Sequence, residues 1–473
     1  NFTADGGTIK LDGNYPVGNY NVALGDTALD NGSFSGANNV AVGNASMSAT
    51  TSGNFNASVG AFSLKLNTTG SSNTAFGSGS LENNTTGSSN VGLGTSALVS
   101  NTTASNNTAV GNLAGYSNTT GYQNTFLGKG TGYSNTTGRE IIAVGYEAGY
   151  GNTTGTFNTY IGWKTGYSNQ TGTSNVVIGG DAFKLGGTSA SYNTGVGKNT
   201  LQNTSGNSNT ALGMDALNAN TTASNNTAVG YQAGYSNTTA TNNVAVGYKA
   251  GYTTTTGISN TSVGTSSLQL NTTGQNNVAL GTGSLYANTT GQSNTSVGSN
   301  ALVANTTASN ITAVGYRALA GNTTGAGNNA LGYQALATNT TANYNTAFGH
   351  VALSLNVTGT ENTAVGSQTM YNNTGNYNTA MGGQALYANT SGANNVAMGV
   401  QALRYNTTAS ENTAVGYQAG YANTTGTRNT AIGKGAGYAN TTAYNGVFVG
   451  TSAGITVTTG NNNTCIGYLT GYA

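Results

Sequence analysis

The stretch Asn106–Gly121 reads NNTAVGNLAGYSNTTG, and most of the chain is a variation on it. Its clearest landmark is Gly111, the glycine that follows Ala-Val. An equivalent glycine recurs from Gly25 to Gly467 at a spacing of 17 in the numbering, with rare spacings of 16 or 18, which makes 27 repeats. A fixed period this short predicts a solenoid, in which each repeat forms one coil that rests on the previous one.

The composition agrees with such a coil and excludes several other classes of protein. Only 5% of the 473 residues are charged and the net charge is +1, so the clustered Lys and Arg that nucleic acids or anionic membranes require are missing. Equivalent side chains of successive coils stack about 4.8 Å apart, where like charges would repel. The single cysteine, Cys465, excludes an internal disulfide framework, and no apolar run is long enough for a transmembrane helix.

Counting from the anchor glycine as position 0 gives an expected core. Position −1 is always apolar and position −3 is mostly Thr or Val, and residues of the same parity share one face of a strand. We expect both positions inside the coil, with the small Ala at position −2 facing outward. Position +4, which is usually Leu or Gly, is the second core position. The predicted core residues at position −1 include Val110, Val144, Val229, Val314 and Val415.

Glycine and asparagine are expected to shape the rest of each coil. Position −4 is Asn in 24 of 27 repeats, and stacked Asn side chains form hydrogen-bonded ladders. We predict a strand at about −4 to −1, a bend at the glycine, a short second strand near +2 to +5, and an NTTG turn. The predicted turn glycines include Gly111, Gly145, Gly230, Gly315 and Gly416. The predicted Asn ladder includes Asn107, Asn124, Asn158, Asn226 and Asn243.

Position +4 is Gly in ten repeats, and in nine of them Tyr follows at position +5. Two explanations are open. The tyrosine fills the space that the missing Leu leaves, or the AGY units are duplicated by descent without a packing reason. Tyrosine also recurs at position +1, where other repeats carry Lys or Asp, so this second set is expected to be exposed. Exposed aromatic rows either contact sugars or neighbouring rods, or stack for rigidity.

The sequence offers no chemistry for catalysis. There is one histidine, His350, the acidic residues are scattered, and the repeated Asp of a calcium-binding β-roll is missing. We therefore expect no catalytic residues, no cofactor and no metal site. The recurring Asn-Thr-Thr and Asn-Asn-Thr match the N-glycosylation sequon, which has two interpretations here: a turn that recurs for structural reasons, or glycosylation of exposed turns.

The motif NTAVGYQA at 226–233 resembles the head repeats of trimeric autotransporter adhesins, and similar repeats occur in phage tail fibres and bacterial surface fibres. The resemblance covers residues 21–473, although the period is longer here than in the adhesin heads because of the NTTG turn. It implies a left-handed parallel β-roll and an assembly of three chains. It also implies a fibrous protein outside the cell or on a virion.

Together these features predict an all-β protein, a flattened two-sided parallel β-solenoid of about 27 coils. Residues 1–20 form an N-terminal cap or docking segment and residues 21–473 a continuous repeat domain. The expected function is an extracellular structural or adhesive fibre, self-associated end to end or as a lateral trimer, with surface glycans as a further partner. The alternatives are a ligand-binding solenoid such as an ice-binding protein, whose outward Thr-x-Thr rows are not expected here, and a phage tail-fibre shaft.

Overall fold

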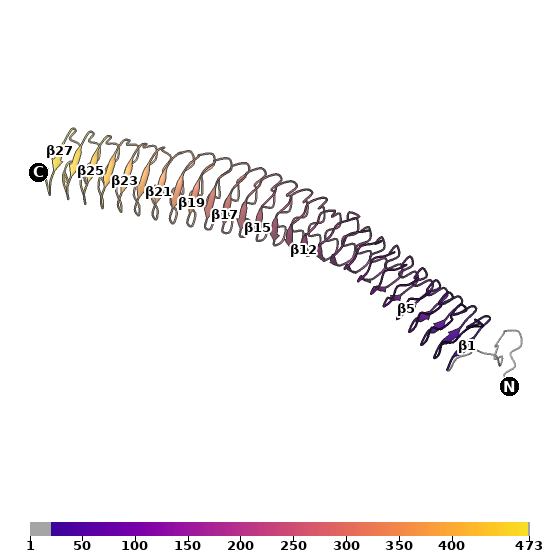
Figure 1. Ribbon diagram of the computed structural model, residues 1–473. Coiled ribbons are helices and arrows are strands. Elements are labelled where there is room, and N and C mark those ends of the chain that lie inside the picture. The colour runs from indigo at the N-terminus through magenta and orange to yellow at the C-terminus, as the bar shows by residue number, and fades with distance from the viewer. Residues whose placement is uncertain (1–19, 472–473) are drawn as a thin grey trace. The chain divides into compact units, whose positions relative to one another are not determined.

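The computed structural model describes residues 20–471, and these contain 27 β-strands and no helix. Each strand is three residues long and covers positions −3 to −1 of one repeat. Strands of successive repeats pair in parallel with equivalent residues opposite each other, as Val22 pairs with Val40. The chain is therefore a parallel β-solenoid in which each sequence repeat forms one coil, as the period predicted (Figure 1).

The strands are, in chain order, β1 (Val22–Leu24), β2 (Val40–Val42), β3 (Ala57–Val59), β4 (Thr74–Phe76), β5 (Val91–Leu93), β6 (Thr108–Val110), β7 (Thr125–Leu127), β8 (Ile142–Val144), β9 (Thr159–Ile161), β10 (Val176–Ile178), β11 (Thr194–Val196), β12 (Thr210–Leu212), β13 (Thr227–Val229), β14 (Val244–Val246), β15 (Thr261–Val263), β16 (Val278–Leu280), β17 (Thr295–Val297), β18 (Thr312–Val314), β19 (Asn329–Leu331), β20 (Thr346–Phe348), β21 (Thr363–Val365), β22 (Thr379–Met381), β23 (Val396–Met398), β24 (Thr413–Val415), β25 (Thr430–Ile432), β26 (Val447–Val449) and β27 (Thr464–Ile466).

The chain divides into two compact units, Asn1–Thr239 with strands β1–β13 and Ala240–Ala473 with strands β14–β27. The same coil recurs within each unit, with Thr210 opposite Thr227 in the first and Thr295 opposite Thr312 in the second. The cap or docking segment predicted at residues 1–20 lies, except for Tyr20, outside the described residues.

The middle residue of each strand, and not its neighbours, points into the coil. Ala109 is fully buried, Thr108 is exposed and Val110 is partly exposed. The prediction that positions −1 and −3 lie in the core was therefore wrong, because the alternation was read correctly but assigned to the opposite face. The predicted core residues that are instead partly exposed are Val110, Val144, Val229, Val314 and Val415.

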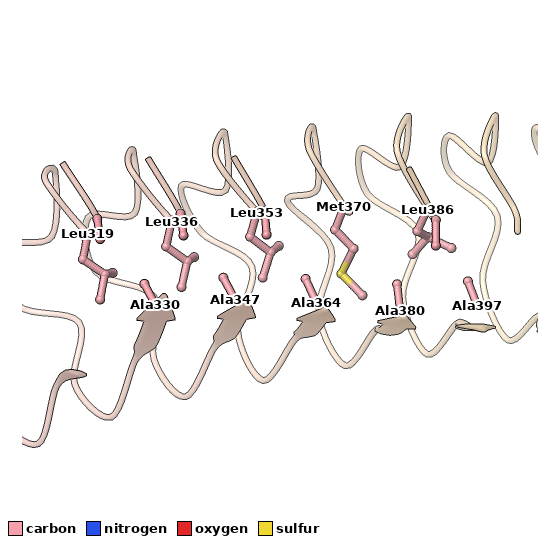
Figure 2. Packing of buried hydrophobic residues seen from close by; sticks show 14 of the residues in the cluster. Leu319, Ala330, Leu336, Ala347, Leu353, Ala364, Met370, Ala380, Leu386 and Ala397 are labelled. Atoms are coloured by element: carbon pink, nitrogen blue, oxygen red, sulfur yellow. The ribbon is translucent and has the colours of Figure 1, made fainter. Parts of the chain in front are cut away.

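The thinness of the coil explains why small residues fill its inner face. Figure 2 shows one row of large side chains, such as Leu336 and Leu353, facing a row of alanines, such as Ala347 and Ala364. The large side chains occupy position +4, which the sequence correctly placed in the core. Since the opposite wall supplies a large side chain in most coils, the strand in those coils has room mainly for Ala, Ser or Gly.

The wall opposite the sheet is a run of turns, so the second strand predicted near +2 to +5 is wrong. Its residues alternate into the left-handed region, with φ of 54° at Ser96 and 52° at Leu98 in one such wall. A strand cannot form where alternate residues have positive φ. The backbone nevertheless bonds from coil to coil, since the Leu98 N–H donates to the Ala114 carbonyl at 2.9 Å.

The anchor glycines are confirmed as turn residues. Gly111 has φ of 136°, a conformation that L side chains rarely adopt, and a Cβ placed there would lie 2.5 Å from the Gly128 carbonyl oxygen. Both strain and the close stacking of coils therefore require glycine at position 0. The predicted glycines share this conformation, with φ between 131° and 136°: Gly111, Gly145, Gly230, Gly315 and Gly416.

Six of the ten glycines at position +4 are explained by an aromatic residue on the strand opposite them. The aromatic ring of Phe126, at position −2 of its coil, is fully buried and occupies the space that Leu side chains at Gly115 and Gly132 would need. Of the two explanations left open, filling by the Tyr at +5 does not hold in this coil, because Tyr116 is only partly buried and stacks on another tyrosine instead. The same arrangement recurs where Tyr160 lies between Gly149 and Gly166, and where Phe448 lies between Gly437 and Gly454.

This exchange of large and small residues predicts a rescue by double substitution. Phe126→Ala alone is expected to cost about 3–5 kcal/mol through the cavity it leaves. Gly132→Leu alone is expected to destabilise the coil by overpacking against the ring. The double variant restores the Ala-and-Leu pairing of the other coils and should recover most of the loss, since Leu adopts the required positive φ elsewhere, as at Leu98. Thermal unfolding of all four proteins measures the coupling, and additive losses would contradict it.

Candidate interaction surfaces

Two columns of buried asparagines run along each unit. At position −4, the Asn107 side-chain oxygen accepts the Asn124 backbone N–H at 2.9 Å, while the Asn107 side-chain amide donates to the Gly121 carbonyl at 2.9 Å. At position +7, the Asn118 amide donates to the same carbonyl at 2.9 Å and to the Asn101 side-chain oxygen at 3.0 Å. The two columns therefore meet at one carbonyl per coil and hold the strand edge to the NTTG turn.

The Asn ladder predicted from the sequence is confirmed at its five named positions. Further contacts join Asn158 to Asn175, Asn226 to Asn209 and Asn243 to Asn260 in the same pattern. The Asn that recurs at position +7, before Thr-Thr-Gly, forms the second column, as expected of stacked turns that carry Asn. Ile141 replaces the Asn at position −4, so the ladder is interrupted there. The Asn124 side-chain oxygen is still satisfied, because it accepts the Ile141 backbone N–H at 3.0 Å.

Burial separates the glycosylation sequons into two groups. The Asn of the recurrent Asn-Thr-Thr lies at position +7, is buried in most coils and uses its amide in the ladder, as Asn118 does. These sequons recur for structural reasons. The exposed sequons lie elsewhere: at Asn106, Asn225 and Asn462, each directly before the ladder Asn, at Asn310, directly before Ile311, and at Asn44, at position +1.

The outer face of the sheet carries two regular columns of side chains. Position −3 is Thr in most strands and Val in most of the others, and position −1 is apolar in every strand. Many of these side chains are substantially exposed, among them Leu280 at 46%, Phe348 at 51% and Met381 at 50%. We call these two columns the sheet face. Its exposure follows directly from the burial of position −2.

Tyrosines form two further columns on the turn wall. The position +1 set is exposed as predicted, for example Tyr316 and Tyr333, whose ring centroids lie 5.4 Å apart. The longest described stack at position +5 joins four nearly parallel rings with centroid separations of 5.0, 4.9 and 5.0 Å: Tyr116, Tyr133, Tyr150 and Tyr167. Stacking of this kind adds to coil cohesion.

One segment of the first unit concentrates aromatic and charged side chains. The only tryptophan of the chain, Trp163, is 47% exposed and stacks on Tyr146 with centroids 6.4 Å apart. The Lys164 ammonium lies 5.1 Å from the Trp163 ring and 5.5 Å from the Tyr167 ring, so it joins the two aromatic columns. It also pairs with Glu147 at 3.3 Å. A hydrogen bond to Glu147, with smaller desolvation and charge effects, raises the pKa of Tyr146.

A hollow of about 410 Å³ adjoins this aromatic cluster. Tyr150 and Tyr167 form one side of it, and hydroxyl and amide groups, including those of Thr153, Ser168 and Gln170, form the rest. Desolvation, with smaller charge effects, raises the pKa of the Tyr150 phenol. The lining thus combines aromatic surface with neutral hydrogen-bonding groups.

We also searched residues 20–471 for a metal site, a membrane-spanning helix and a reactive buried group. No three His, Cys, Asp or Glu residues in this part of the chain lie close enough to hold a metal ion together. Within the same residues, there is no helix of the length and apolarity needed to cross a bilayer. Burial raises the pKa of the Tyr160 phenol, which lies in the core and has no route to a substrate.

No known protein family matches the chain, and no curated protein is significantly similar to it. The regular coil is compatible with a β-roll repeat, so the resemblance to adhesin and fibre repeats is supported at the level of the solenoid fold.

Proposed function

We propose that the protein is an extracellular structural or adhesive fibre whose rods associate side by side through the sheet face. The observation that carries the proposal is the continuous exposure of apolar side chains at position −1. With strands about 4.8 Å apart, the face of one unit is about 60 Å long. Taken as about 10 Å wide, it covers on the order of 600 Å², and the apolar column is about half of this area, within the range of the largest exposed apolar patches on monomers.

The periodicity of the sheet face argues for a second copy of this chain as its occupant. A surface that repeats every coil is matched along its whole length only by a partner with the same repeat. Its near absence of charge removes the repulsion that would otherwise keep two identical faces apart. The end-to-end contact expected through residues 1–20 remains a prediction, and the sheet face now makes lateral packing the favoured mode.

Charges placed along the sheet face are expected to abolish this association. Leu280→Asp, Phe348→Asp and Met398→Asp lie on β16, β20 and β23, far enough apart for the new charges not to repel within one rod. All three side chains are exposed, so the fold should persist while two faces can no longer desolvate. Sedimentation and electron microscopy are expected to show assemblies for the natural chain and single rods for the triple variant.

The matched control puts the same three charges on the turn side. Thr290→Asp, Thr341→Asp and Thr408→Asp occupy exposed positions at +9 of nearby coils. This variant should assemble as the natural chain does. The proposal would be refuted by a natural chain that stays single, or by assembly of the triple sheet-face variant to the same extent.

Ice binding is a second candidate, because the sheet face displays Thr in an outward, evenly spaced row. The sequence had placed this Thr row inside the coil, and its exposure removes that objection. The face is nevertheless uneven, since position −1 varies among Val, Leu, Ile, Phe and Met, and an ice plane requires a flat partner. The test is thermal hysteresis of the natural chain and of a variant with Thr295→Leu, Thr312→Leu and Thr346→Leu. If the natural chain shows hysteresis and the variant does not, ice binding becomes the proposed function in place of lateral association.

We propose that only the exposed sequons are glycosylated. Attachment to Asn118 or its equivalents would require breaking the ladder, whereas Asn106 and Asn310 are accessible. Peptide mapping of the native protein distinguishes the two groups.

A further inference from the structure

We infer that the turn wall around Trp163 is a binding site for a neutral polysaccharide. The inference supplies a ligand class for the adhesive part of the proposed function and rests on it. Its experiment has a separate readout, because binding to this wall can be measured on single rods whose sheet faces have been blocked.

The aromatic surface is the first element of the site. Trp163 and Tyr146 are 47% and 39% exposed, and Lys164 links them to the Tyr167 ring across the wall. Tyr146 and Trp163 stack on each other, so a sugar would pack against the parts of the rings that this stack leaves exposed. The successive tyrosines lie about 5 Å apart, which is comparable with the length of one pyranose unit along a chain.

The hollow beside Tyr150 and Tyr167 is the second element. It adds the hydroxyl and amide groups that a sugar needs for hydrogen bonds, including those of Thr153, Ser168 and Gln170. Gly151 also lines the hollow, at position +6, where the previous and following coils have serine. A lining that combines aromatic surface with a few neutral polar groups is typical of binding sites for small molecules.

The charges of the site favour a neutral ligand. Lys164 pairs with Glu147 at 3.3 Å, and Lys184 pairs with Asp181 at 2.8 Å while lying 5.1 Å from the Trp163 ring. Each ammonium is therefore already neutralised by a carboxylate. Because these charges are paired, an anionic polymer would gain little attraction from them, although Lys129 adds a further ammonium 5.9 Å from the Tyr146 ring. A neutral sugar does not depend on this balance of charges.

The single tryptophan makes the site directly observable. The probes are neutral hexasaccharides of glucose, mannose and N-acetylglucosamine, with heparin as the anionic comparison. The protein is the full-length chain carrying the three sheet-face charges. At least one neutral hexasaccharide is expected to shift the Trp163 fluorescence and to give a saturable calorimetric signal, with little change when salt is raised.

Two variants and a control locate the binding. Trp163→Ala and Tyr167→Ala should each weaken calorimetric affinity at least tenfold, while Tyr417→Ala, which removes an exposed tyrosine of the second unit, should leave it unchanged. The inference is overturned if no neutral hexasaccharide binds, if the Trp163 and Tyr167 variants bind normally, or if only heparin binds in a salt-sensitive manner.

Discussion

Replacing Ala364 by aspartate is expected to unfold the coils around β21, the largest effect of any substitution considered. Ala364 is fully buried between Ala347 and Ala380 and faces the large side chains of the opposite wall (Figure 2). The carboxylate would be buried without a partner in a space that holds only a methyl group. Its cost is several kcal/mol from desolvation, with overpacking added. Hydrogen exchange across β20–β22 measures the loss coil by coil.

The neighbouring substitution Val365→Asp is the control. Val365 lies on the sheet face and is partly exposed, so its replacement should change stability by less than about 1 kcal/mol. Since each coil contacts mainly its neighbours, the damage in the Ala364 variant should remain local. Equal protection in the two variants, or a greater loss for Val365→Asp, would contradict the assignment of the inner face.

The period, the parallel register and the turn glycines could all be predicted from the sequence, because each follows from repetition itself. A residue that recurs every coil must stack on its own copy, and Gly111 is required by its φ and by the closeness of Gly128. The direction of the strand faces could not be predicted in this way. Apolar Val110 and small Ala109 alternate equally well in either orientation, and hydrophobic residues are not restricted to the interior.

The decisive information lay in the opposite wall. Leu at position +4 and Ala at position −2 fit together only if the coil is too thin for two large side chains. The coils with Phe126, Tyr160 and Phe448 contain this signal in the sequence, since each aromatic at −2 occurs with Gly at +4 of its own coil and of the coil before. Most of the same glycines are also followed directly by tyrosine, which suggested a packing contact between these neighbours as one explanation. Proximity along the chain was taken for proximity in space.

The candidate sites were predictable to different degrees. The exposure of the tyrosines at +1 followed from the Lys and Asp that replace them in other coils. The sheet face was missed because its residues were assigned to the core. The cluster around Trp163 could not be predicted, because it depends on contacts between the columns at positions +1 and +5. The contact from Lys164 to Tyr167 is one of these, and the sequence does not show that the two columns lie side by side.

Replacing Asn288 by leucine is the second large effect that we expect. Its side-chain amide donates to the Asn271 side-chain oxygen at 2.9 Å and to the Gly291 carbonyl at 3.0 Å, and its own oxygen accepts from Asn305 at 2.9 Å. Leucine has the same branching at Cγ but is larger, and it leaves buried partners unsatisfied above and below. The expected cost is about 2–4 kcal/mol, because an unsatisfied buried group costs about 1–3 kcal/mol.

Asn288→Asp should cost more than Asn288→Leu, and this order distinguishes a hydrogen-bonded ladder from simple packing. A carboxylate has the shape of the amide, yet it would face two acceptors, the Asn271 side-chain oxygen and the Gly291 carbonyl. It would also carry a buried charge. Thr290→Val, at an exposed position two residues along, should be nearly neutral. If aspartate is tolerated better than leucine in urea unfolding at neutral pH, the ladder contributes by shape alone and its hydrogen bonds do not hold the coils together.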